Sequence, residues 1–106
     1  ANGVRAISGG EDGVLRVWNL KTGQNEQTLT GHAGWVGGVA VTLDGQRCIT
    51  AGNDRTLRLW NLDTGRELGC AVLGARVTCV AVASASPLQV GAGDQAGNVY
   101  CLEWVE

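Results

Sequence analysis

Apolar residues recur through the middle of the chain in four short runs. The runs are Trp35–Thr42, Arg47–Ala51, Thr56–Leu62 and Glu67–Leu73. In the third run Leu57 and Leu59 alternate with Arg58, as in a strand that is packed on both sides. Turn-forming residues separate the runs, and the glycines of Asp44-Gly45 and Thr64-Gly65 accept the positive φ of a tight turn. The pattern predicts a four-stranded antiparallel sheet.

The same pattern also occurs earlier in the chain, at a distance of 42 residues. Arg5–Gln24 aligns without a gap with Arg47–Arg66, and 11 of the 20 positions are identical. Repeats of about 40 to 45 residues are typical of β-propeller blades, each of which needs neighbours to cover its two faces. We therefore expect an all-β fold of stacked propeller blades.

The runs divide the chain into three units. Residues 1–30 contain the second, third and fourth strands of a blade, residues 31–73 a complete blade, and residues 74–106 the first three strands of a degenerate blade. The strands of this last unit are Val77–Ser84, Leu88–Ala92 and Val99–Val105. The units make two and a half blades of an incomplete ring, and we expect a segment of a longer propeller whose missing first strand lies upstream.

Composition and charge exclude two classes of partner. Seventeen glycines, one proline and no Met or Phe fit short strands joined by tight turns. A net charge of −2 gives no positive field that would attract nucleic acid, and no apolar run is long enough to span a membrane. We expect neither nucleic acid nor a membrane as a partner.

The four cysteines are spaced 22, 9 and 22 residues apart, without a pair suited to a metal ion. They are Cys48, Cys70, Cys79 and Cys101. Each lies in an apolar run, so we expect buried, reduced thiols rather than a disulfide, a zinc site or a reactive centre. Reduced cysteines and the lack of an export signal favour a cytoplasmic protein without a cofactor.

The second unit carries a characteristic set of residues at the ends of its strands. The set consists of Gly31-His32 before the first strand, Thr50 in the second strand, Asp54 in the next turn and Trp60-Asn61 in the third strand. This set resembles the signature of the WD-repeat family. The resemblance implies that Trp60, Thr50, His32 and Asp54 form a chain of hydrogen bonds that stabilises the blade.

The other two units match this signature to different degrees. In the first unit the positions of Thr50, Asp54 and Trp60 are filled by Ser8, Asp12 and Trp18. In the third unit Ala75 replaces the histidine and Leu102 the tryptophan, so we expect no polar network there. We expect apolar packing to hold this unit instead, by Val77, Val80, Val82, Val90, Val99 and Leu102.

His32 and Asp54 would also suit acid–base catalysis. However, the chain has a single histidine, and Thr50 lies within a strand rather than on a strained turn that would present a nucleophile. We therefore expect a structural network, no catalytic residue and no enzyme. Arg16 and Arg58 recur at equivalent positions, and we expect ion pairs with a nearby Asp or Glu rather than a phosphate site.

In the WD-repeat family, partners most often bind the face that bears the loops before the first strands and the turns between the second and third strands. The resemblance places there Trp35, Arg76, Thr78, Glu11, Asn53 and Asp94. Tryptophan and arginine often dominate binding energy. Two interpretations of Trp35 stand side by side, an anchor for a partner and a cover over its own blade.

Two functions fit these observations. The first is a non-catalytic scaffold that recognises a protein or a ligand; the second is a structural segment that completes its own ring. The C-terminal sequence AGDQAGNVYCLEW is similar to the last blade of bacterial propellers attached to signal-transduction nucleotide triphosphatases, which implies the sensor arm of a signalling ATPase. Taken alone, the chain should self-associate or require the missing blades of its parent, because its open strand edges and terminal faces lack covers.

Overall fold

A computed structural model of the chain describes residues 5–42, 45–85 and 87–104, and within them the backbone forms ten strands and no helix. The strands are β1 (Arg5–Gly9), β2 (Val14–Asn19), β3 (Asn25–Thr30), β4 (Val36–Val41), β5 (Arg47–Gly52), β6 (Thr56–Asn61), β7 (Glu67–Val72), β8 (Val77–Ala85), β9 (Leu88–Asp94) and β10 (Val99–Trp104). No helix in this part of the chain could cross a membrane.

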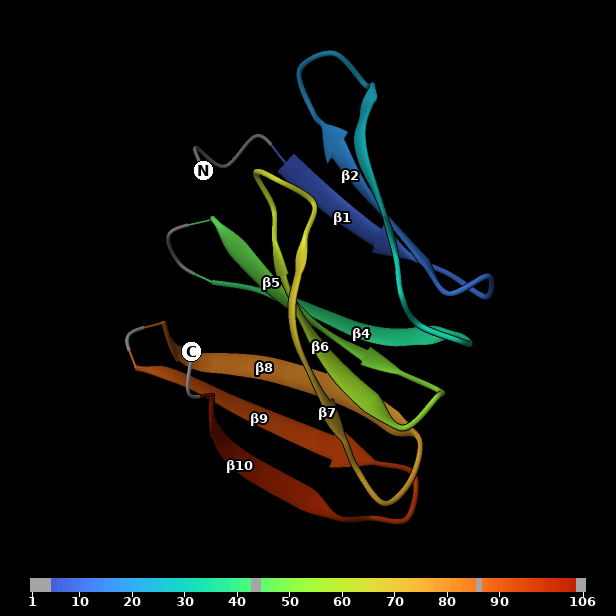
Figure 1. Cartoon of the computed structure of the whole chain (residues 1–106), viewed down its shortest axis with the longest axis vertical. Coiled ribbons are helices and arrows are strands. Elements are labelled where there is room, and N and C mark those ends of the chain that lie inside the picture. The colour runs from blue at the N-terminus through green and yellow to red at the C-terminus, as the bar shows by residue number, and fades with distance from the viewer. Residues whose placement is uncertain (1–4, 43–44, 86, 105–106) are drawn as a thin grey trace.

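The strands form three antiparallel sheets that are stacked one on another (Figure 1). The first sheet is β1-β2-β3, the second is β4-β5-β6-β7 and the third is β8-β9-β10. The predicted all-β fold of propeller blades is confirmed. Asp44 and Val105, which the sequence placed in a turn and at the end of a strand, lie outside the described residues. We keep the units 1–30, 31–73 and 74–106 as our interpretation of this arrangement.

Equivalent positions can be assigned from the backbone hydrogen bonds of the second and third sheets. The carbonyl of Trp35 accepts from the N–H of Asn53 at 2.7 Å, and the carbonyl of Arg76 accepts from the N–H of Gln95 at 2.8 Å. The register then continues in the same way as far as Val41 in β4 and Val82 in β8. Trp35 and Arg76 are therefore equivalent residues, each directly before the innermost strand of its sheet.

Two apolar cores lie between the sheets. The core between the first and second sheets contains Leu15, Val17, Leu29, Cys48, Trp60 and Leu62. The core between the second and third sheets contains Ile49, Ala51, Leu57, Leu59, Val77, Leu88, Val90 and Ala92. Side chains alternate between the two sides of a strand, so β5 and β6 contribute to both cores and are buried along most of their length. Within the described residues, the first and third sheets each have only one of their two faces covered by another sheet.

The innermost strands begin with an irregularity at the same place. The register shifts between Val36 and Gly38 in β4 and between Val77 and Cys79 in β8. Each shift leaves one extra residue, Gly37 or Thr78, opposite the partner strand. Such bulges turn the backbone locally and re-aim the neighbouring side chains, so they shape the rim from which Trp35 and Arg76 project.

Candidate functional site

The second sheet holds a continuous chain of side-chain hydrogen bonds. Nε1 of Trp60 donates to Oγ1 of Thr50 at 2.9 Å, and this hydroxyl lies 2.6 Å from Nε2 of His32. Nδ1 of His32 lies 3.1 Å from Oδ1 of Asp54. Asp54 also accepts from the Thr56 hydroxyl at 2.6 Å. The chain ties the loop before β4 to the strands β5 and β6.

Burial and hydrogen bonding set the charges in this network. Burial lowers the pKa of His32 below its ordinary value of 6.5, although the Asp54 carboxylate acts in the opposite direction. Burial also opposes ionisation of Asp54, but hydrogen bonds from Thr56, the Ala33 N–H and His32 outweigh it and hold the pKa of the carboxyl well below 3.8. Near neutral pH the imidazole is therefore neutral, with its proton on Nδ1 toward the carboxylate, and Thr50 donates to Nε2.

Gly52 makes room for this network, a feature that the sequence analysis missed. A Cβ at this position would collide with Nδ1 of His32 and Oδ1 of Asp54. The absence of a side chain at the end of β5 thus lets the imidazole lie over the backbone. The signal in the sequence was a glycine two residues before the turn aspartate.

The first sheet holds a shorter version of the network. Nε1 of Trp18 donates to Oγ of Ser8 at 2.9 Å, the same distance as in the second sheet. Asp12 does not join this pair; its carboxylate accepts from the N–H of Val14 at 3.1 Å and pairs with Arg16 at 3.4 Å. Ser8, Asp12 and Trp18 therefore occupy equivalent positions without forming a single chain.

The predicted ion pairs of the recurring arginines are present. Arg16 pairs with Asp12, and Arg58 pairs with Glu67 at 2.8 Å and with Asp54 at 3.5 Å. Both arginines therefore form ion pairs within their own sheets, as predicted for arginines on the surface of a blade.

Asp94 is not a surface residue, and this prediction was wrong. Only 7% of the residue is exposed, and its carboxylate accepts from the Tyr100 hydroxyl at 2.7 Å and from the backbone N–H groups of Ala96 and Asn98 at 3.0 Å. The hydrogen bond from Tyr100 is the main reason why the pKa of Asp94 is lowered. By register, Asp94 is equivalent to Gly52, so its side chain enters the space that the imidazole fills in the second sheet.

The expectation that the third unit relies on apolar packing alone is therefore corrected as well. A different polar network, centred on Asp94, replaces the one that lacks its histidine. Val77 and Val90 are buried in the core as predicted, but Val99 is 82% exposed, because it lies on the side of β10 that no sheet covers.

The cysteines also differ from the prediction of four buried thiols. Cys48 is buried, and burial raises the pKa of its thiol to about 12. Cys70, Cys79 and Cys101 are exposed. All four are unpaired, and among the described residues no three His, Cys, Asp or Glu side chains gather closely enough to hold a metal ion.

The network of the second sheet is poorly suited to catalysis. His32 and Thr50 are buried, and each already uses its polar atoms within the chain of hydrogen bonds. Within the described residues, every buried side-chain nitrogen or oxygen has a hydrogen-bond partner. A general base must reach the proton that it removes from a substrate, and His32 presents no free atom to one.

The remaining predicted residues lie along one rim of the stack. Trp35 is 57% exposed, and Arg76 and Thr78 are also exposed. Glu11 is exposed on the turn of the first sheet and Asn53 is half-buried on the turn of the second. We call these five residues the recognition rim: Glu11, Trp35, Asn53, Arg76 and Thr78.

The backbone of the recognition rim is held by hydrogen bonds, whereas the side chains of Trp35 and Arg76 are exposed. The Trp35 and Arg76 carbonyls are bonded to the facing turns, as described above. The N–H of Val36 donates to the carbonyl of Gly10 at 3.1 Å, which ties the rim of the second sheet to that of the first. The Thr78 hydroxyl donates to the carbonyl of Gly93 at 3.2 Å.

Comparisons with known proteins agree with this architecture. The family described as TEP-1 C-terminal beta-propeller matches residues 32–104. Nuclear distribution protein PAC1-2 of Uncinocarpus reesii is 42% identical over 46 residues, which are 43% of this chain and 10% of that protein. The chain therefore spans about a tenth of that relative.

A solved structure is similar over almost the whole chain. The crystal structure of the Cps50 (Swd1) beta-propeller domain of Myceliophteria thermophila matches with a TM-score of 0.91 and 21% identity. The match covers 98% of this chain and 33% of that chain. At this identity the likeness bears on the fold alone.

Proposed function

We propose, since the chain belongs to the TEP-1 C-terminal beta-propeller family, that it is a non-catalytic WD-repeat scaffold that recognises a protein partner through the recognition rim. The observation that carries the proposal is the pairing of Trp35 and Arg76 at equivalent positions. Both side chains are exposed, while the carbonyl of each is held by a hydrogen bond. A backbone that is already held in place loses little entropy on binding, so the entropy cost falls mainly on the two anchor side chains.

The chemistry of the rim suggests what the partner presents. Trp35 offers an apolar surface with one N–H donor, and Arg76 offers a guanidinium that makes no ion pair within the described residues. An extended segment with an apolar side chain near a carboxylate would satisfy both. Because 57% of Trp35 is exposed, this residue fits an anchor for a partner better than a cover over its own sheet.

A peptide selection tests this proposal. A random peptide library displayed on phage would be selected against the chain, and the selected peptides would be tested against the double variant Trp35→Ala, Arg76→Ala. We expect peptides with an apolar and an acidic residue, and a loss of binding of tenfold or more in the variant, because truncating one anchor typically costs about 2 kcal/mol.

The matched control is the double variant Leu20→Ala, Arg66→Ala. These residues are also an exposed large apolar side chain and an exposed arginine, but they lie on turns between β2 and β3 and between β6 and β7. Peptides that bind the control and the rim variant equally well would refute the proposal. Unchanged thermal unfolding of both variants shows that binding, not folding, is measured.

The finer predictions are extensions of this proposal. The resemblance of the C-terminal sequence supports the sensor arm of a signalling ATPase, and four unpaired cysteines support a reducing compartment such as the cytoplasm. A second function, a segment that completes a ring, is favoured by the uncovered faces of the first and third sheets.

A further inference from the structure

The first junction of the stack shows how two sheets of this chain bind one another. The side of the first sheet that carries Ile7, Leu15 and Val17 receives the side of the second sheet that carries Thr50 and Trp60. We call the first side the receiving side and the second the tryptophan side. Trp60 is only 1% exposed because the receiving side covers it.

Among the described residues, each end of the stack leaves one of these sides without a covering sheet. By register and by the 42-residue repeat, the open side of the first sheet is a tryptophan side, with Ser8 and Trp18 in place of Thr50 and Trp60. The open side of the third sheet is a receiving side, with Gly91, Val99 and Cys101 in place of Ile7, Leu15 and Val17. The two open sides are thus of complementary type.

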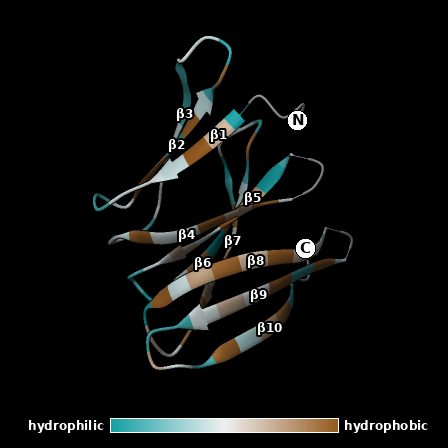
Figure 2. Cartoon of the chain, turned by 180° about the vertical axis from the view of Figure 1, so that it is seen from behind, coloured by the Kyte–Doolittle hydropathy of each residue, from teal (hydrophilic) through white to brown (hydrophobic). Residues whose placement is uncertain are grey.

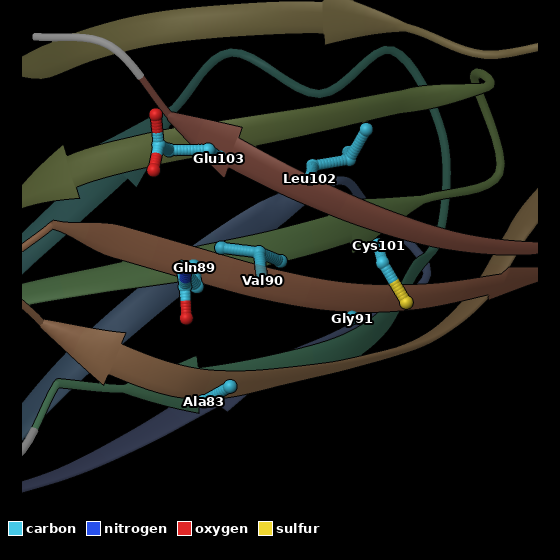
Figure 3. Close-up of a pocket in the computed structure, with 7 residues that line it drawn as sticks. All are labelled: Ala83, Gln89, Val90, Gly91, Cys101, Leu102 and Glu103. Carbon is cyan, nitrogen blue, oxygen red and sulfur yellow. The ribbon is translucent and has the colours of Figure 1, made fainter.

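The open receiving side is apolar and hollowed. One hollow of about 390 Å³ is bordered by Ala83, Gly91, Cys101 and Glu103, among others (Figure 3). A second hollow of about 300 Å³ lies between Cys79, Gly93 and Val99. Hydrophobic colouring extends along β8 and part of β10 (Figure 2). The space arises because the residues on this side are smaller than their equivalents in the first sheet. A sheet face with a side chain as large as that of Trp18 would fill it.

Charges at the edge of the junction point to the same pairing. At the first junction Nη1 of Arg5 lies 3.0 Å from Oδ1 of Asp63, which lies in the turn after β6. The equivalent turn residue after β2 is Lys21; in both turns the N–H of this residue donates to an asparagine side chain at 2.8 Å. On the third sheet Gln89 replaces Arg5, and its partner across the strands is Glu103. The charges are exchanged relative to the first junction. The receiving side of the third sheet carries the acidic residue, Glu103, and a tryptophan side like that of the first sheet would bring the basic residue, Lys21.

We propose that the open receiving side of the third sheet binds the open tryptophan side of the first sheet of a second copy of this chain. The contact repeats the geometry of the first junction, with Trp18 on the hollowed face and Lys21 beside Glu103. It is a head-to-tail contact, so copies add in one direction rather than as a symmetric pair.

A zero-length cross-link tests the pairing directly, because Lys21 is the only lysine in the sequence. A mixture of ¹⁵N-labelled and unlabelled chain would be treated with a carbodiimide, which joins amines to carboxylates, and the digested dimer analysed by mass spectrometry. We expect the principal mixed-isotope peptide to join Lys21 to Glu103. A chain that stays monomeric at concentrations of several hundred micromolar, or dimers joined only at other carboxylates or at the terminal amine, would overturn the proposal.

Charge reversal provides an independent test. Both Lys21 and Glu103 are exposed, so reversing either should leave the fold intact. By sedimentation, Lys21→Glu or Glu103→Lys alone should weaken self-association about fivefold. The two single variants mixed one to one should recover it, because each contact between unlike chains then joins opposite charges. The double variant should recover it, because the pair is restored in exchanged order. Equal weakening in the double variant, or no effect of either reversal, contradicts the pairing even if the chain associates through its strand edges.

Discussion

Gly52 lies so close to the polar network that a side chain at this position should lower the free energy of unfolding. Gly52→Ala places a methyl group against His32 and Asp54, and overpacking of this kind typically costs about 1–3 kcal/mol. We expect a loss of that size in the free energy of unfolding in urea. Gly34→Ala is the matched control, because the nearest atom to its Cβ would be Cβ of Asn53 at 3.6 Å, and it should change stability little.

The charges of His32 and Asp54 predict instability in acid. Because folding lowers both pKa values, the unfolded chain binds more protons than the folded chain, and stability falls as pH falls. The loss should begin as pH drops through about 6.5, where His32 of the unfolded chain titrates, and should continue below about 4 as Asp54 does.

Urea unfolding between pH 8 and pH 3 measures this dependence. His32→Gln should be less stable at pH 7 but should lack the first part of the loss, between about pH 7 and pH 5. If the variant and the native chain lose stability in parallel over that interval, His32 is not the group responsible.

The thiols should differ in reactivity although all four are free. Cys48 is buried with a pKa of about 12, so its reactive thiolate is scarce, whereas Cys70, Cys79 and Cys101 are exposed. Titration of dilute native chain with an aromatic disulfide reagent should modify three thiols quickly and the fourth only after unfolding. Rapid modification of the fourth thiol in the folded chain would contradict the burial of Cys48.

Single positions also show where prediction from sequence stops. The polar network of the second unit follows from the resemblance of Gly31-His32 and Trp60-Asn61 to a family signature. The burial of Asp94 does not follow from the sequence, because an aspartate beside glycines in a turn is usually exposed. Its place is decided by the missing histidine, which leaves a space, and by Tyr100, which provides a donor.

Among the strands, β2 and β6 offer a comparison within one molecule. Trp18 and Trp60 occupy equivalent positions and make the same hydrogen bond, but only Trp60 is covered by a neighbouring sheet. Trp60→Ala should cost about 3–5 kcal/mol, the range for a buried aromatic residue, and Trp18→Ala clearly less. Urea unfolding of the dilute chain measures both; equal losses would show that the hydrogen bond, not the cover, determines the cost.

The strands themselves could be predicted because alternation and turn residues agree along the chain. The positions of the bulges could not, because no residue type marks them: the extra residue is Gly37 in β4 and Thr78 in β8. Exposure of Cys79 and Cys101 was missed for a different reason. An apolar strand residue is buried only if a second sheet lies on that side, and the local sequence does not say which sides are covered.

Across the whole molecule, protection should be greatest in the middle of the stack. The second sheet is covered on both faces, whereas the first and third are each covered on one. Hydrogen exchange followed by mass spectrometry should therefore show the slowest amides in β5 and β6 and faster exchange in β1 and β10, which open locally at lower cost. Uniform protection of all three sheets would mean that they unfold as one unit.

The polar contacts at the two rims of the first junction also bear on the geometry of a closed propeller. At one rim the N–H of Val36 holds the carbonyl of Gly10, and at the other Nε2 of Gln27 donates to the carbonyls of Leu62 and Asp63 at 2.9 and 2.8 Å. These hydrogen bonds lie on both sides of the apolar core and hold the angle between the first and second sheets. Successive angles of this kind must sum to a full circle in a ring, so Gln27 helps to determine how many blades such a ring can contain.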